Sequence, residues 1–377
     1  MNAVFSLRRL HTLIVKELIQ MRRDRLTFAM MLGVPLMQLL LFGFAINNDP
    51  RNLPAALVAP TQDRFTRAIV SALENTGYYR FVRPAAAAGE AEFLIARGDV
   101  SFVVTVPSDF GRRVLRGERP QILIEADATD PAVASGAIST LGTVSAGALA
   151  RELGATATPE TDAARLDIVV HRRYNPEGIT QYNVVPGLLG VILQMTMVMM
   201  TSMALTRETE RGTMENLLAM PASPLEIMLG KIMPYLLVGA VQVAVVLAAA
   251  RAVFAVPFVG SLTLLLSGVF VFVLALVILG YLISTVARTQ MQAMQLTFFF
   301  FLPSLLLSGF MFPYRGMPGW AQALGEIFPL THFLRLVRAV MLKGAELPAV
   351  AQPMAALGVS ALVFAVLALL RFRRTLD

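Results

Sequence analysis

The sequence predicts an α-helical polytopic membrane protein with six transmembrane helices and an inserted extracytoplasmic α/β domain. Of its 377 residues, 56% are hydrophobic and only 15% are charged, whereas soluble domains are typically about a quarter charged. Mean hydropathy is +0.65. Six apolar runs each have about the 20 residues that a membrane-spanning helix needs. One long segment, residues 47–183, is instead water-soluble in composition, with 14 Arg and 16 acidic residues.

The first 46 residues predict a membrane-surface helix followed by the first span. In residues 1–26, apolar side chains recur at steps of three and four, and basic side chains fall largely elsewhere. This pattern is typical of an amphipathic helix in the cytoplasmic interface; an ordinary cytosolic helix is the alternative. Residues 27–46 are uncharged and just long enough to span. Because no convincing cleavage site follows, we interpret this run as a retained span and not as a signal peptide.

Residues 47–183 predict one compact α/β domain. Short apolar runs suit strands, and helix-like patterns of apolar residues lie between them. Gly98-Asp99 and Gly117-Glu118 are typical of turns that end helices. The four apolar runs are residues 55–59, 100–106, 122–126 and 166–170.

Residues 184–377 predict a transmembrane domain that holds spans two to six. An even number of spans places both termini on one side, and the basic residues near both ends place that side in the cytoplasm. Residues 47–183 then lie outside, where their length exempts them from the positive-inside rule. The five expected spans are approximately residues 184–206, 232–256, 259–287, 291–313 and 350–370.

Residues 314–349 form an unusual outward segment between spans five and six. Two helical patches flank Pro329, and neither is long enough to cross the membrane. Short apolar helices broken by Pro and Gly are typical of re-entrant or interfacial elements, and Tyr314 and Trp320 suit the headgroup region. A loop packed on the outer domain is the alternative. Four cations oppose the outward placement under the positive-inside rule: Arg315, Arg335, Arg338 and Lys343.

The chain lacks the local sequence signals of several reaction classes. None of the six spans contains Asp or Glu, which disfavours a proton-coupled or sodium-coupled transporter, because coupling ions usually need an ionisable residue at membrane depth. There is no phosphate-binding loop, no nucleophile elbow and no cysteine, and the three histidines are far apart. We therefore expect a non-catalytic chain that holds no metal or cofactor. The basic ends suit anionic lipid and not nucleic acid.

A charged stretch between spans two and three, residues 207–231, is the expected point of energy input. It continues span two into the cytosol as a polar helix. Ser223-Pro-Leu-Glu226 then predicts a new helix, with Ser at the N-cap and Glu closing a capping box. A short helix held between two spans can pass motion to both. The alternative is a solvated loop with an internal Arg211–Glu215 pair.

Three motifs resemble the permeases of type-2 ABC exporters, in the subgroup with a large extracytoplasmic domain between spans one and two. Glu210-Arg-Gly-Thr-Met-Glu215, with Pro-Ala-Ser-Pro-Leu-Glu-Ile-Met-Leu-Gly-Lys231 behind it, resembles the cytoplasmic loop of that family. Leu306-Leu-Ser-Gly-Phe-Met-Phe-Pro313, followed by Pro329-Leu-Thr-His-Phe333 and Arg338, resembles its signature near the last two spans. Asp127-Ala-Thr-Asp-Pro131 and the Gly98–Phe110 stretch resemble the subgroup's outer domain.

The resemblance implies a permease subunit that forms the pathway as a dimer with an identical or homologous permease. A separate ABC ATPase would bind ATP and Mg, the outer domain would be periplasmic and would dock a periplasmic adaptor protein, and the chain would lie in a bacterial inner membrane. The implied ATPase-coupling residues are Glu208, Glu210, Arg211, Gly212, Thr213, Glu215, Leu217 and Leu218, flanked by Glu17, Arg22, Arg23 and Arg25. The implied exit-side residues are Tyr314, Trp320, Glu326, Pro329, His332 and Arg338.

Two other functions compete with a multidrug-efflux permease. A membrane sensor or receptor would use the outer domain to bind a ligand, but it would need only one or two spans. An ion-coupled secondary transporter is disfavoured by the acid-free spans. For an exporter, the Met-rich second span is compatible with a hydrophobic or amphipathic cargo of unknown identity.

Overall fold

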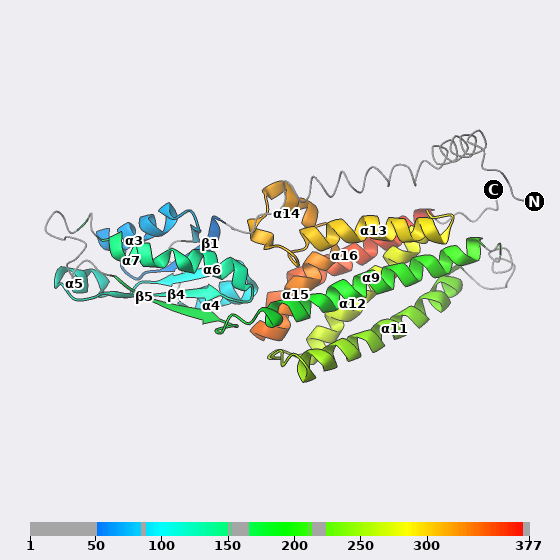
Figure 1. Ribbon diagram of the computed structural model, residues 1–377, viewed down its shortest axis with the longest axis horizontal. Helices are drawn as coiled ribbons and strands as arrows, with labels where there is room; N and C mark the ends of the chain where they lie inside the picture. The colour runs from blue at the N-terminus through cyan, green and yellow to red at the C-terminus, as the bar shows by residue number, and fades with distance from the viewer. Residues whose placement is uncertain are drawn as a thin grey trace, which may run out of the picture.

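The computed structural model describes residues 51–83, 88–149, 152, 166–210, 212 and 224–371. The predicted interfacial helix 1–26 and the predicted span 27–46 lie outside these residues. Figure 1 shows an elongated molecule with a sheet-containing region at one end and a bundle of long helices extending away from it.

The sheet-containing region is built on five strands in the order β2-β1-β3-β4-β5. All neighbouring strands are parallel except β3 and β4, which are antiparallel. Four strands coincide with the four apolar runs of the sequence. Strand β2 had no such signal, because its Tyr-Arg-Phe-Val-Arg sequence is interrupted by two arginines. The strands are β1 Leu53–Val58, β2 Tyr79–Arg83, β3 Phe102–Thr105, β4 Gln121–Asp127 and β5 Asp167–Arg173.

Helices cover both faces of this sheet. Side chains alternate between the two faces along a strand, and in β1 both sets are buried. Leu53, Ala55 and Leu57 join the core with α3, α5, α6 and α7, while Ala56 and Val58 pack with α4. Burial on both faces explains why β1 is a continuous apolar run. The helices are α3 Arg64–Asn75, α4 Ala88–Arg97, α5 Phe110–Leu115, α6 Pro131–Ser139 and α7 Leu141–Gly147.

Four helices in the described part of the chain are long and apolar enough to cross a membrane. They correspond to predicted spans two, four, five and six. The predicted third span falls in α11 Pro224–Ala252, whose described apolar stretch, Val238–Ala252, is shorter. Of the six spans expected from the sequence, four are therefore supported by the described residues. The four helices that are long and apolar enough to cross a membrane are α9 Thr180–Glu210, α12 Leu262–Ser284, α13 Gln290–Leu307 and α16 Leu347–Arg371.

Helix α9 packs against four other helices, α11, α12, α13 and α15 Pro329–Lys343. A glycine permits its close approach to α12. A Cβ atom built on Gly280 would lie 2.8 Å from the Cβ of Thr201 and 2.9 Å from the carbonyl oxygen of Val198. Small residues at such crossings are typical of membrane helix packing.

Gly280→Ala is expected to destabilise the bundle by about 1–3 kcal/mol, because overpacking displaces a helix backbone. Thermal unfolding of the detergent-solubilised chain measures this effect. Gly358→Ala in α16 is the matched control, since nothing lies within 4 Å of its added methyl group and alanine favours helix. Equal unfolding temperatures for the two variants would contradict the close approach of α9 and α12.

Two short helices follow α13 at the end of the bundle nearest the sheet: α14 Gly319–Gly325 and α15 Pro329–Lys343, preceded by the 3-10 turn Tyr314–Gly316. Pro329 is the first residue of α15, where its missing N–H costs nothing. The inward face of α15 packs on the bundle, and Phe333 stacks on Phe272 at 4.2 Å between ring centroids. With 15 residues, α15 is too short to span.

Candidate functional site

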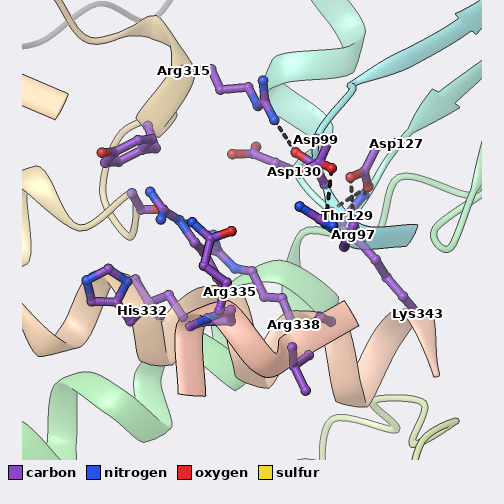
Figure 2. Close-up of a pocket in the computed structure, with 18 of the residues that line it drawn as sticks. Arg97, Asp99, Asp127, Thr129, Asp130, Arg315, His332, Arg335, Arg338 and Lys343 are labelled. Atoms are coloured by element: carbon purple, nitrogen blue, oxygen red, sulfur yellow. Dashed lines mark hydrogen bonds and ion pairs between the residues drawn. The ribbon is translucent and has the colours of Figure 1, made fainter. Parts of the chain in front are cut away.

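Residues of the segment 314–343 line one side of a cavity of about 480 Å³ where the helix bundle meets the sheet region. Figure 2 shows His332, Arg335 and Arg338 on α15, with Asp99, Asp127 and Asp130 of the sheet region across the cavity. Tyr314, His332 and Arg338 of the predicted exit-side set line it, whereas Trp320 is exposed on α14. Glu326 lies just behind the lining, in contact with Arg335.

A buried ion pair joins α15 to the sheet. The Nζ atom of Lys343 lies 2.6 Å from a carboxylate oxygen of Asp127 and donates to the carbonyl oxygen of Ile95 at 3.1 Å. The two side chains are only 7% and 14% exposed. Asp127 also accepts hydrogen bonds from the backbone N–H and hydroxyl of Thr129. This carboxylate is therefore fixed by both its own strand end and α15.

A second contact joins the same two parts of the molecule. Arg315 donates to the carbonyl oxygen of Gly98. Gly98 has φ +78°, a left-handed conformation that ends α4 and that glycine adopts readily. The sequence left open whether this segment forms short helices or a loop packed on the inserted domain. Residues 314–343 contain two short helices, and they also contact the sheet region.

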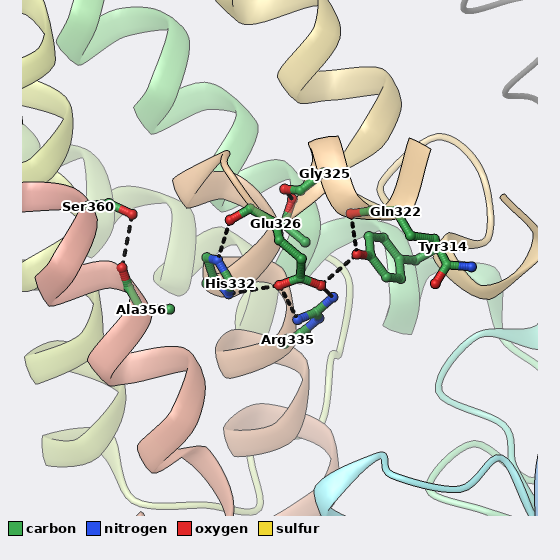
Figure 3. A network of polar contacts seen from close by, with 9 residues as sticks. Tyr314, Gln322, Gly325, Glu326, His332, Arg335, Ala356 and Ser360 are labelled. Carbon is green, nitrogen blue, oxygen red and sulfur yellow. Dashed lines mark hydrogen bonds and ion pairs between the residues drawn. The ribbon is translucent and has the colours of Figure 1, made fainter. Parts of the chain in front are cut away.

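Behind the cavity, Glu326 is the centre of a polar network (Figure 3). Arg335 binds both carboxylate oxygens, at 2.5 and 3.0 Å, which is the bidentate arrangement that guanidinium favours. The Tyr314 hydroxyl lies 2.5 Å from Glu326 and 2.7 Å from the carbonyl oxygen of Gln322. The network ties the turn before α14 to the first turns of α15.

His332 completes the network, with its Nδ1 atom 3.7 Å from a carboxylate oxygen of Glu326. Its Nε2 atom lies 2.8 Å from the carbonyl oxygen of Glu326, which can only accept, so Nε2 carries the proton. Burial lowers the pKa of His332 below its ordinary value. Burial alone would raise the pKa of Glu326, but hydrogen bonds from Arg335 and Tyr314 hold it below its ordinary range. Burial and the bond to Glu326 raise the pKa of Tyr314.

Acidification is expected to destabilise this network. The unfolded chain binds a proton at His332 near pH 6.5, whereas the folded chain resists it until lower pH, so stability falls as pH drops below about 6.5. Glu326 acts in the same direction at lower pH, since its folded pKa is also depressed. Unfolding temperatures at pH 7.5 and 5.5 measure the effect. His332→Gln should reduce the loss, and an unchanged loss would contradict the role of His332.

At the opposite end of the bundle, the structure places part of the predicted coupling surface. Glu210, at the end of α9, accepts from the backbone N–H of Gln290 at 3.1 Å and from its side chain at 3.0 Å. Gln290 is the first residue of α13, so a carboxylate lies at a helix N-terminus, where it is stabilised. Glu208 and Gly212 lie beside it. Arg211, Thr213, Glu215, Leu217, Leu218, Glu17, Arg22, Arg23 and Arg25 lie outside the described residues.

Buried polar side chains link α9 to its neighbours between these two ends. The Ser304 hydroxyl donates to Gln194 at 3.1 Å. The hydroxyls of Ser202 and Thr297 lie 3.2 Å apart, and the Thr196 hydroxyl donates to Gln242 of α11 at 2.9 Å. Polar contacts of this kind hold helices together in an apolar environment. Within the described residues, no group of three His, Cys, Asp or Glu side chains could hold a metal ion.

Comparison with known proteins decides the family. The sequence pattern of the family described as "ABC-2 family transporter protein" matches residues 25–370, nearly the whole chain. The chain belongs to the ABC-2 transporter family. The predicted resemblance to type-2 ABC permeases is thereby confirmed.

Its relatives within the ABC-2 family include three permeases of Escherichia coli K12. The chain is 28% identical to "Probable multidrug ABC transporter permease YbhS" over 384 residues, which cover all of both chains. It is 30% identical to "Probable multidrug ABC transporter permease YbhR" over 339 residues, 90% of this chain and 91% of the relative. It is also 30% identical to "Inner membrane transport permease YhhJ" over 335 residues, 86% of each chain.

Several contact residues of this ABC-2 chain were not among the predicted site residues. Arg335, Arg315 and Lys343 were noted only as cations that oppose the expected topology, and Asp127 only as part of a family motif. The sequence did indicate that these cations have partners, because a charge beside apolar helices is costly unless it is paired. The partners of Arg315 and Lys343, which are Gly98 and Asp127, lie 217 and 216 residues earlier in the chain, and no local pattern joins them. Only Arg335 has a partner nearby, because Glu326 is 9 residues away.

Proposed function

We propose that this chain is the membrane-spanning subunit of an ATP-driven exporter and forms the translocation pathway as a dimer with an identical or homologous permease. A separate cytoplasmic ABC ATPase supplies the energy by hydrolysing ATP with Mg. The observation that carries the proposal is the family match over residues 25–370, together with full-length similarity to proteins named as multidrug permeases. A hydrophobic or amphipathic cargo is compatible with the Met-rich α9.

The arrangement of α9 supports mechanical coupling. This helix has 31 residues, so it is on the order of 45 Å long. Its Glu210 end is tied to α13 by Gln290, and near its other end Gly190 packs against Phe333 of α15. A push from a bound ATPase at the Glu210 end would therefore tilt α9 and carry α13 with it. The outward helices would then move relative to the cavity.

The positions of the two ends support the proposed topology. The sheet region and residues 314–343 contact each other and so share one side, which we assign to the periplasm of a bacterial inner membrane. The Glu210 end is then cytoplasmic, with both termini. The proposed periplasmic domain would be the docking site of an adaptor protein.

ATP-dependent transport in inside-out membrane vesicles tests the proposal. Vesicles that contain the chain and its ATPase should accumulate a hydrophobic dye when ATP is added, even after a protonophore has removed the proton gradient. Replacing the lysine of the partner's phosphate-binding loop should abolish this uptake. Uptake driven by the proton gradient alone would favour a secondary transporter, and no uptake under either condition would favour a sensor.

A further inference from the structure

We propose that the cavity between α15 and the sheet region is a binding site for a singly charged phosphodiester group, held by Arg315 and Arg338. The proposal goes beyond the export function and does not depend on which cargo is moved.

The cavity holds more positive than negative side chains. Five cations and three carboxylates line it. Three of the cations have a carboxylate partner: Lys343 binds Asp127, Arg97 binds Asp99, and Arg335 binds Glu326 behind the lining. The remaining two cations are Arg315 and Arg338.

Arg315 and Arg338 differ from the others because their hydrogen bonds within the described residues go to backbone carbonyl oxygens. Arg315 donates to Gly98, and Arg338 donates through Nη1 to Gly309 at 3.2 Å. The Nε atom of Arg338 is buried and has no hydrogen-bond partner. A buried donor without an acceptor costs free energy, and a carbonyl dipole compensates a full charge only in part.

Neither arginine can relieve this cost by losing its proton. Burial lowers the pKa of both side chains. The carboxylate of Asp127 acts in the opposite direction on both arginines, and that of Asp130 does so on Arg338, but the net pKa shift is still downward. An arginine side chain nevertheless stays protonated in proteins. An anion in the cavity would supply the missing charge and accept the free N–H of Arg338.

The shape and charge of the cavity select the class of ligand. Its volume, about 480 Å³, lies in the range of small-molecule sites. The planar guanidinium group matches the two oxygens of a carboxylate or phosphate. Asp99 and Asp130 face the same space, so a multiply charged anion would be repelled more strongly than a singly charged one. A phospholipid headgroup and a soluble phosphodiester are both sources of that chemistry.

Thermal unfolding of the full-length chain in lipid-free, nonionic detergent tests the site, with dimethyl phosphate and phosphatidylglycerol as separate probes. At constant ionic strength, a probe that binds should raise the unfolding temperature of the native protein. Each arginine removed should weaken binding about tenfold or more, since hydrogen bonds to charged groups are strong. Arg315→Gln/Arg338→Gln should therefore respond to neither probe. Arg116→Gln, whose side chain is 69% exposed, should respond as the native protein does.

The two probes separate the sources of the anion. A response to both identifies a site open to soluble phosphodiesters, and a response to phosphatidylglycerol alone identifies a lipid site. No response of the native protein to either probe overturns the proposal, as does an equal response of the double variant. If the double variant fails to fold, Arg315→Gln alone decides, because the bond it removes is a single one to a carbonyl oxygen. Full retention of binding in that variant also overturns the proposal.

Discussion

Lys343→Ala is expected to open the junction between the helix bundle and the sheet region, with amide exchange at the ends of α4 and β4 roughly a hundredfold faster. The substitution leaves Asp127, whose side chain is 14% exposed, without its cation. Removing one partner of a buried ion pair costs about 3 kcal/mol, and each 1.36 kcal/mol is a factor of ten. The carbonyl oxygen of Ile95 loses its donor as well. Hydrogen–deuterium exchange by mass spectrometry measures the local change.

A double-mutant cycle separates the ion pair from general loss of packing. Asp127→Asn combined with Lys343→Ala should exchange little faster than either single variant, because the pair is already broken in each. Arg116→Ala removes an exposed cation paired with Glu118 at 3.7 Å and should change exchange very little. Additive effects of the two junction substitutions would show that Lys343 and Asp127 do not act as a pair.

Local sequence patterns predicted the elements whose environment is uniform along their length. Strand β1 is buried on both faces and reads as an apolar run, and the turns at Gly98 and Gly117 have φ +78° and +71°. Strand β2 could not be found in this way, because it lies at the edge of the sheet and its two arginines interrupt the apolar pattern. Its buried Tyr79, which donates to the carbonyl oxygen of Ala137 at 3.0 Å, is a tertiary contact.

The sequence predicted the short helices of the candidate site, but it did not predict the contacts that join them to the sheet region. Pro329 and the short apolar patches predicted elements that do not span, and α14 and α15 have that form. The pairing of Lys343 with Asp127 could not be identified, because the two residues are 216 positions apart in the chain. Only the tertiary fold brings them together. Two of the four cations that oppose the expected outward placement, Arg335 and Lys343, are thus paired with carboxylates inside the protein, which weakens the objection from the positive-inside rule.

Glu215→Lys is expected to abolish ATP-dependent transport and association with the ATPase while leaving membrane insertion intact. On the proposed function, Glu215 lies in the charged stretch that meets the ATPase, five residues beyond Glu210 in the sequence. Reversing a charge at a complementary interface replaces an attraction by a repulsion, which costs several kcal/mol. A loss of about 4 kcal/mol would lower affinity roughly a thousandfold. Dye uptake by inside-out vesicles and co-purification with the ATPase measure the two effects.

Glu346→Lys provides the matched control for this substitution. Glu346 is exposed at the opposite end of the bundle, just after α15, so its reversal changes the net charge by the same amount away from the proposed ATPase. Glu346→Lys should retain transport and ATPase binding, and an equal loss in both variants would point to a general effect of charge on the chain. Normal transport by Glu215→Lys would contradict the proposal that residues 207–231 couple the permease to the ATPase. Energy would then have to enter through another cytoplasmic surface, for which the predicted interfacial helix 1–26 is the next candidate.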